Sequence, residues 1–298
     1  MTPATFAQLL QQIADPDGDP ELLAETLVFD SGQSGPLSPI LRLNPRFHPA
    51  VDDPLAFESV SDHLRRLRQR RFFTRIARGW SGARVIAQGD SWFQFPLVRD
   101  TIRQLDRDHA VYCLSAADPV HNPAAQAALL SAIPEIRPDA VLISAGGSDL
   151  FGSSRLKALA DPTSAAPGGF SAYLDHFLLR DLMPRFLELF RRVRAIDAQV
   201  PILLHSYAYP IPRGIWLSRP LEDVGISDRQ QQGSLIRALI DHFHAQLQAC
   251  IATSGLEYLH LVDCRAVVGG NWFDELHPNH QGFEQVAQCF RLAIAGLR

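Results

Sequence analysis

From residue 83 onward the sequence alternates short apolar segments with longer helical ones, and this alternation limits the possible folds more than any other feature. The strand-like segments are 83–88, 110–115, 139–145, 200–207 and 257–263. The helical segments are 97–107, 124–133, 173–197, 233–252 and about 281–296. Four of the strands are nearly continuous apolar runs, as expected where both faces of a sheet are covered. We therefore predict an α/β fold, a three-layer α/β/α sandwich around a five-stranded parallel sheet.

Composition and charge exclude several classes of protein. The chain has 298 residues, of which 46% are hydrophobic, and a formal net charge of -4. Disorder and nucleic-acid binding by bulk charge are therefore not expected. The four cysteines are widely spaced, which argues against a disulfide scaffold or a zinc ribbon. Neither a signal peptide nor an apolar run of membrane-spanning length is recognisable, so we expect a cytoplasmic protein without a membrane span.

Residues 1–80 differ from the rest of the chain. They contain loop-forming stretches at 15–20 and 31–39 and end in an arginine-dense segment, 63–79. We expect residues 1–80 to be an N-terminal helical extension, a lid or an interface, and 81–298 to be the main domain. Segment 63–79 could be a basic amphipathic helix for an anionic membrane surface, or a helix docked by its apolar stripe. The negative total charge favours the docked helix.

Polar residues follow three of the predicted strands. Ser91 lies in Gly-Asp-Ser-Trp-Phe after the first strand, Ser148 lies in Gly-Gly-Ser-Asp after the third, and Asp274 and His277 follow the fifth. Working residues of a parallel sheet gather at the carboxyl ends of its strands, so Ser91, Asp274 and His277 are expected at one edge.

These residue types suit nucleophilic catalysis. A serine hydroxyl needs a base, imidazole is the base suited to neutral pH, and a carboxylate orients the imidazole. A less favoured interpretation of the same segment is a metal site made of Asp274, His277 and His280, which lie three residues apart. We expect no metal and no organic cofactor.

The sequence blocks VIAQGDSWF, ISAGGSDLFG and DELHPNHQGF occur in this order within residues 83–298. With these blocks the chain resembles the SGNH (GDSL-type) hydrolase superfamily, which has a flavodoxin-like fold. The resemblance implies that Ser91 is the nucleophile, His277 the base and Asp274 its partner. It also implies an oxyanion hole made of the Ser91 N–H, a backbone N–H of the second block and an asparagine side chain of the third.

The chain departs from the family pattern at two oxyanion positions. The second block lacks its usual glycine, and we place its donor at Ala117. In the third block Ser148 stands where the family has asparagine. The loss of one oxyanion donor costs about 10²–10³ in rate, so this substitution bears directly on activity.

The substrate side is indicated by aromatic residues. Phe93 and Phe95 beside the nucleophile suggest an apolar wall for an acyl chain or an aromatic group. The segment 207–216, which ends at Trp216, is predicted to be a loop that shapes the pocket. A packed structural loop is an equally good interpretation of this segment.

The function predicted from these residues is hydrolysis of a small-molecule carboxylic ester through a Ser91 acyl-enzyme, as in serine esterases and lipases. One alternative is an acyltransferase that uses the same three residues. Another is a degenerate member of the family that binds lipid or sugar without turnover, which the serine at position 148 favours.

Overall fold

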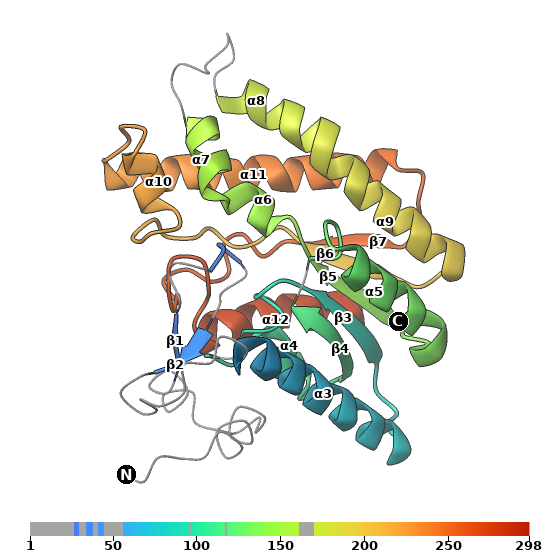
Figure 1. Ribbon diagram of the computed structural model, residues 1–298. Coiled ribbons are helices and arrows are strands. Elements are labelled where there is room, and N and C mark those ends of the chain that lie inside the picture. Colours follow the sequence, from blue (N-terminus) through green and yellow to red (C-terminus); the bar gives the residue numbers. More distant parts are fainter. Residues whose placement is uncertain are drawn as a thin grey trace.

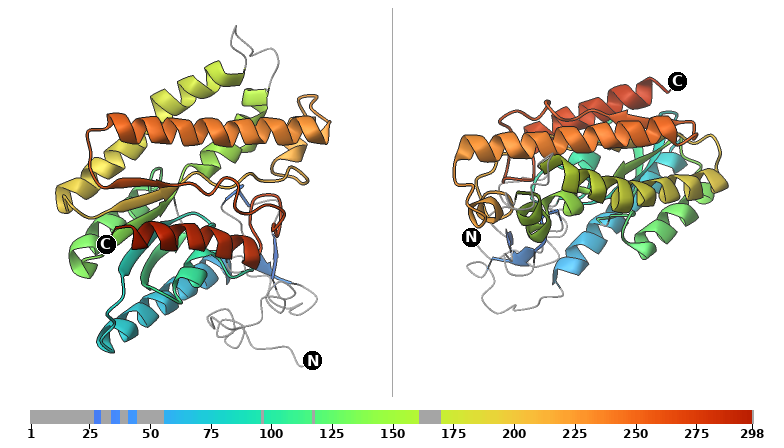
Figure 2. Two further views of the ribbon diagram at one scale, coloured as in Figure 1. Left: turned by 180° about the vertical axis from the view of Figure 1, so that it is seen from behind. Right: turned by 90° about the horizontal axis from the view of Figure 1, so that it is seen from above.

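The main body of the protein is a parallel β-sheet between two layers of helices (Figure 1, Figure 2). The computed structural model describes residues 27–29, 34–37, 41–44, 56–95, 97–116, 118–160 and 170–297. The five strands are β3 (Arg84–Gly89), β4 (Ala110–Ala116), β5 (Ala140–Ser144), β6 (Ile202–His205) and β7 (Leu259–Val262). Their order in the sheet is β4-β3-β5-β6-β7, and every neighbouring pair is parallel. The predicted three-layer α/β/α sandwich is thus confirmed.

The helices cover both faces of this sheet. They include α4 (Thr101–Leu105), α5 (Pro123–Ile136), α9 (Met183–Ile196), α11 (Arg229–Thr253) and α12 (His280–Ala295). Helices α4 and α12 pack on each other, whereas α9 packs on both α5 and α11. All five residues of β5 are buried, in agreement with its continuous apolar sequence. The carboxyl ends of the strands therefore meet at one edge between the layers.

Some helices differ from the sequence prediction. The segment expected as one helix over 173–197 is divided into α8 (Phe170–Phe177), the π-helical η2 (Leu178–Leu182) and α9. Pro184 accounts for the interruption, because proline has no N–H to donate to the preceding turn. Three further helices were not predicted: α6 (Gly147–Phe151), α7 (Ser153–Ala160) and α10 (Ser218–Glu222).

The N-terminal extension is helical over α3 (Ala56–Ala77), which packs on the edge strand β4. Leu64, Arg68 and Phe72 recur every fourth residue and are all buried, so they share the face toward the sheet. The exposed face carries arginines, as expected for the docked helix. Phe73, part of the predicted apolar stripe, is instead 46% exposed.

The extension is not helical throughout, contrary to the prediction. Strands β1 (Leu27–Phe29) and β2 (Leu41–Leu43) form a two-stranded antiparallel sheet. The sequence of β1, Leu-Val-Phe, is of the β-branched and aromatic type that strands favour. The predicted loop at 15–20 lies outside the described residues.

No helix in the described ranges is both long and apolar enough to cross a membrane.

Candidate active site

The structure brings Ser91, His277 and Asp274 together at the carboxyl edge of the sheet. Ser91 lies just beyond β3, while Asp274 and His277 lie in the loop between β7 and α12. Ser91 Oγ is 2.8 Å from His277 Nε2, and His277 Nδ1 is 2.7 Å from Asp274 Oδ2. The second carboxylate oxygen of Asp274 accepts the backbone N–H groups of Leu276 and His277, each at 2.7 Å. The three side chains thus form a continuous hydrogen-bonded chain.

The environment of Asp274 fixes the tautomer of the imidazole. Burial alone raises the pKa of Asp274, but the charge of His277 and the hydrogen bonds from His277 and Leu276 bring this pKa below its usual value. An ionised carboxylate only accepts hydrogen bonds, so Nδ1 of His277 carries the proton that faces it. Nε2 is then free to accept the proton of the Ser91 hydroxyl. This is the arrangement that a general base requires.

Phe95 holds the imidazole in place. Its ring lies parallel to the His277 ring, with an interplanar angle of 1° and 4.1 Å between ring centroids. The backbone N–H of Phe95 donates to Asp100 Oδ2 at 2.9 Å, and Asp100 Oδ1 caps α4 by accepting the Arg103 N–H at 2.9 Å. One carboxylate therefore fixes both the start of α4 and the aromatic ring that covers the base.

Arg68 connects the loop after Ser91 to α3. Its guanidinium donates to Asp100 Oδ2 at 2.6 Å and to the carbonyl oxygen of Phe93 at 3.0 Å. Both side chains are buried, and a buried ion pair that loses one partner leaves an uncompensated charge. A helix that precedes β3 thus fixes the geometry of the loop that contains Phe93 and Phe95.

Beside Ser91, the carboxylate of Asp90 lies at the centre of a buried polar network. Burial lowers the pKa of His205 to about 3, so this histidine is neutral. His205 Nδ1 accepts the Tyr207 N–H at 3.2 Å, which places the ring proton on Nε2, 2.8 Å from Ser144 Oγ. Ser144 in turn donates to Asp90 Oδ1 at 2.7 Å. Burial raises the pKa of Asp90, and the hydrogen bonds from Tyr207, Ser144 and the Trp92 N–H oppose this rise.

Tyr207 completes the network. Its hydroxyl donates to Asp90 Oδ2 and accepts the Gly147 N–H at 3.0 Å. Sequence reasoning missed Asp90, Ser144, His205 and Tyr207 as residues of the site. Their positions in the sequence could have indicated Ser144 and His205, because these are the polar last residues of the apolar strands β5 and β6.

Of the three predicted oxyanion donors, the structure describes Ser91 and Ser148, and their surroundings differ. The Ser91 N–H donates to the carbonyl oxygen of Leu37, at 3.3 Å. The Leu37 side chain is buried and lies so close to Gly147 that a Cβ there would be 2.0 Å from Leu37 Cδ1. Ser148, the second residue of α6, is exposed. Ala117 lies outside the described residues.

The three aromatic residues predicted to lie beside the substrate have different surroundings. Phe95 covers His277, as described above, whereas Phe93 is buried among core rings, with its centroid 5.9 Å from that of His205 and 5.6 Å from that of Phe290. Trp216 is half-buried, and its backbone N–H donates to the carboxylate of Glu275.

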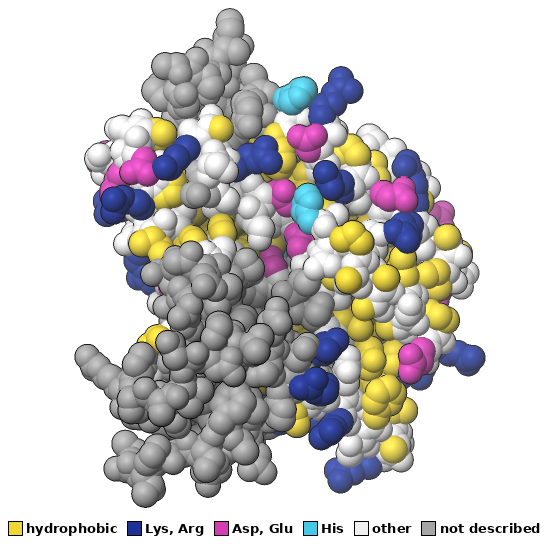
Figure 3. Space-filling view, viewed as in Figure 1, with side chains coloured by type: hydrophobic (Ala, Val, Ile, Leu, Met, Phe, Trp, Pro, Cys, Tyr) yellow, Lys and Arg dark blue, Asp and Glu magenta, His cyan; other side chains and the backbone are white. Residues whose placement is uncertain are grey.

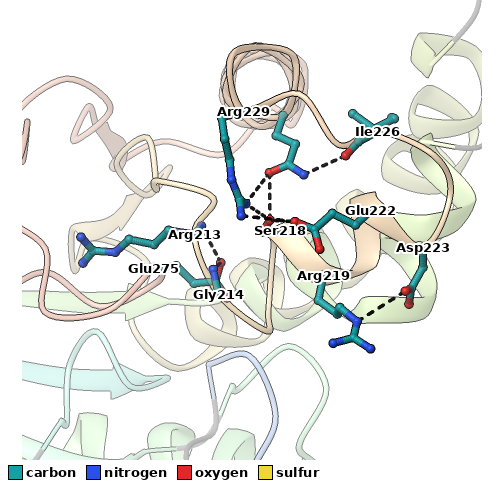
Figure 4. Close-up of polar contacts among 10 residues, drawn as sticks. Arg213, Gly214, Ser218, Arg219, Glu222, Asp223, Ile226, Arg229 and Glu275 are labelled. Carbon is teal, nitrogen blue, oxygen red and sulfur yellow. Dashed lines mark hydrogen bonds and ion pairs between the residues drawn. The ribbon is translucent and has the colours of Figure 1, made fainter.

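The loop that precedes Trp216 is hydrogen-bonded to the loop that contains Asp274 and His277. Glu275 Oε2 accepts the backbone N–H groups of Arg213, at 3.2 Å, and Gly214, at 2.9 Å (Figure 4). The Arg213 guanidinium donates to the carbonyl oxygen of Asp274 at 3.1 Å. Sequence reasoning did not assign Glu275, whose role depends on a contact between residues about sixty positions apart.

Two of the three residues of the alternative metal site, Asp274 and His277, form a hydrogen bond with each other. Within the described ranges no group of three or more His, Cys, Asp or Glu side chains is placed to hold a metal ion.

The Asp90 network predicts that Tyr207→Phe destabilises the fold. The substitution leaves the Gly147 N–H and one oxygen of Asp90 without their partner in a buried position, which costs about 1–3 kcal/mol. The free energy of unfolding, measured by urea denaturation, checks this. Tyr209→Phe is the matched control, because the Tyr209 hydroxyl donates to the more accessible Asp241 and its loss should cost less than about 1 kcal/mol. Equal losses in the two variants would contradict the assignment.

Comparison with known proteins finds similar solved structures at low identity. No family model and no curated protein sequence matches the chain. An extracellular lipase from Streptomyces rimosus is 15% identical, with 71% of this chain and 100% of that chain covered and a TM-score of 0.48. A phospholipase A1 from Streptomyces albidoflavus is 13% identical, with 71% and 99% covered and a TM-score of 0.45. A protein from Bacteroides ovatus described as a GDSL-like lipase is 12% identical, with 73% and 54% covered and a TM-score of 0.44.

Proposed function

We propose that this protein hydrolyses a carboxylic ester through a covalent acyl-enzyme on Ser91. The observation that carries the proposal is the hydrogen-bonded chain from Ser91 Oγ through His277 to Asp274. In the first step His277 Nε2 takes the hydroxyl proton while Ser91 Oγ bonds to the ester carbonyl carbon. The tetrahedral intermediate collapses, the alcohol leaves with the proton from His277, and the acyl group stays on Ser91. Water, deprotonated by the same imidazole, then bonds to the acyl carbon; the bond to Ser91 Oγ breaks, Oγ takes back the proton from His277, and the acid is released.

The oxyanion of the tetrahedral intermediate needs donors beside Ser91. We assign this role to the Ser91 N–H, to the N–H of Ala117 and to the Ser148 hydroxyl. Leu37 supports the first assignment, since its carbonyl oxygen accepts that N–H in the structure. The exposed side chain of Ser148 leaves its hydroxyl accessible to a ligand or to a bridging water.

The substrate is proposed to be a small-molecule ester whose acyl part lies near Phe95 and Trp216. The degenerate alternative, a family member that binds lipid or sugar without turnover, is favoured by one observation: Ser148 replaces the family's asparagine. Transfer of the acyl group to an alcohol instead of water would use the same first step, and product analysis with added alcohols separates the two.

The first test is covalent labelling of Ser91 with a fluorophosphonate, together with turnover of a chain-length series of p-nitrophenyl esters. Ser91→Ala and His277→Ala should each reduce kcat to near background, and the double variant should lose little more because the residues act as a unit. Asp274→Asn should retain more activity than Ser91→Ala. Additive losses in the double variant would contradict the assignment of Ser91 or His277.

The second test concerns Ser148. If its hydroxyl stabilises the oxyanion, Ser148→Ala lowers kcat and kcat/KM together, by less than the roughly 10²–10³ expected for a well-placed amide. Ser148→Asn should raise kcat. An unlabelled, inactive wild type together with a labelled, active Ser148→Asn would establish the degenerate binder instead.

We also propose that the N-terminal extension acts as a lid over this site. Leu37 supports this role, because its carbonyl oxygen accepts the Ser91 N–H and its side chain packs against Gly147. A substrate oxygen that uses the same N–H would have to displace the Leu37 carbonyl.

Removal of the lid should make Ser91 more accessible. Deletion of residues 1–55 leaves α3 complete and should increase the rate of fluorophosphonate labelling. The point variant Leu37→Ala removes the side chain beside Gly147 and should act in the same direction if the truncated chain fails to fold. Leu27→Ala, which alters a buried side chain of β1, is the control. An unchanged labelling rate in Leu37→Ala would contradict a lid.

A further inference from the structure

A pocket of about 450 Å³ lies between α3 and the α4 segment. Ser91, Asp274 and His277 are not among its lining residues, and Arg103 is joined to their surroundings by its backbone N–H, which donates to Asp100. The charged side chains that line it are Arg70, Arg71, Arg75, Arg78, Arg103, Arg107 and Asp106. In Figure 3 basic side chains gather over α3, in the lower part of the face shown. The chain as a whole carries a net charge of -4, so this concentration of arginines is local.

Arg103 is the most deeply placed of these arginines. It is 8% exposed, and within the described part of the chain its Nη2 has no hydrogen-bond partner. Burial lowers the pKa of Arg103 to about 10; the charge of Asp100 opposes this shift, whereas Arg68, Arg99 and Arg71 add to it. A buried guanidinium donor without an acceptor is costly, so the site favours a ligand that supplies one.

The acidic side chain of the pocket does not balance this charge. Asp106 forms an ion pair with Arg75 at 3.5 Å, and Arg75 also donates to the carbonyl oxygen of His109 at 2.5 Å. The remaining arginines of the lining come from two directions. Arg70, Arg71 and Arg78 belong to α3 or the turn after it, while Arg103 and Arg107 belong to the α4 segment. An anion between the two segments would therefore be approached from both sides.

We propose that this pocket binds a dianionic phosphate group, either of a free phosphate compound or of a lipid headgroup that is a phosphate monoester. The planar guanidinium donates two parallel hydrogen bonds to phosphate oxygens, and a phosphoryl dianion can accept from several arginines at once. A single carboxylate has fewer oxygens and one charge, so it would neutralise less of the pocket. The volume suits a headgroup or a small phosphate ester. The site is separate from the proposed hydrolase chemistry.

The test measures binding by the full-length chain. Isothermal titration calorimetry with inorganic phosphate and with pyrophosphate measures binding of free compounds. Co-sedimentation with phosphatidylcholine vesicles, with and without phosphatidic acid, measures binding to a lipid headgroup. Binding should weaken as salt is added, because the contact is electrostatic. Binding of the free anions, or of the phosphatidic acid vesicles alone, supports the proposal and identifies the source of the phosphoryl group.

Variants locate the site. Arg103→Gln should weaken binding about tenfold or more, as the loss of a hydrogen bond to a charged group does. Arg70→Ala combined with Arg107→Ala changes only exposed residues and should have the same effect if Arg103→Gln does not fold. Arg66→Ala, an exposed arginine of α3 outside the pocket, is the matched control and should bind like the wild type.

Three outcomes would overturn the proposal. The first is that neither the free compounds nor the vesicles bind. The second is an equal loss of affinity in Arg66→Ala and in the double variant of Arg70 and Arg107. The third is equal binding of vesicles that contain phosphatidylserine in place of phosphatidic acid. The last result would mean attraction to general negative charge.

Discussion

The buried carboxylate of Asp90 holds together the edge of the sheet at which Ser91, Asp274 and His277 meet. It accepts hydrogen bonds from Ser144 at the end of β5 and from Tyr207 just beyond β6, and it lies next to Ser91 in the chain. A buried carboxylate is stable only where hydrogen bonds replace the water that it loses, so the ends of three strands are drawn around it. The Gly147 N–H joins the same network through Tyr207. Ser91 therefore follows a residue whose position three strands determine.

A second carboxylate, that of Asp100, has a similar role on the other side of Ser91. Asp100 accepts from Phe95, from the first turn of α4 and from Arg68 on α3. Because Phe95 stacks on His277, the orientation of the base depends on this ion pair as well as on Asp274. The imidazole is thus positioned from both parts of the chain, the helix before the sheet and the loop after it.

Much of the architecture could be predicted because it depends on local patterns. Apolar runs gave β5 and its neighbours, and the carboxyl ends of the strands located Ser91 and His277. The contacts of Arg68, Leu37 and Glu275 could not be predicted, since each joins residues that are distant in sequence. The pairing of β1 with β2 was also missed, because three-residue strands carry too little periodicity to be recognised.

The hydrogen bond from the Ser91 N–H to the Leu37 carbonyl has an energetic consequence for any ligand of that N–H. Such a ligand exchanges one hydrogen bond for another, so it gains only the difference between the two. A neutral carbonyl oxygen is about as good an acceptor as the one that it displaces, whereas an anionic oxygen is a stronger one. The exchange therefore gives little to an ester in its ground state and more to its tetrahedral intermediate. Displacement of the Leu37 oxygen costs both states the same, so the preference of this donor for the intermediate comes from the stronger hydrogen bond to the anion alone.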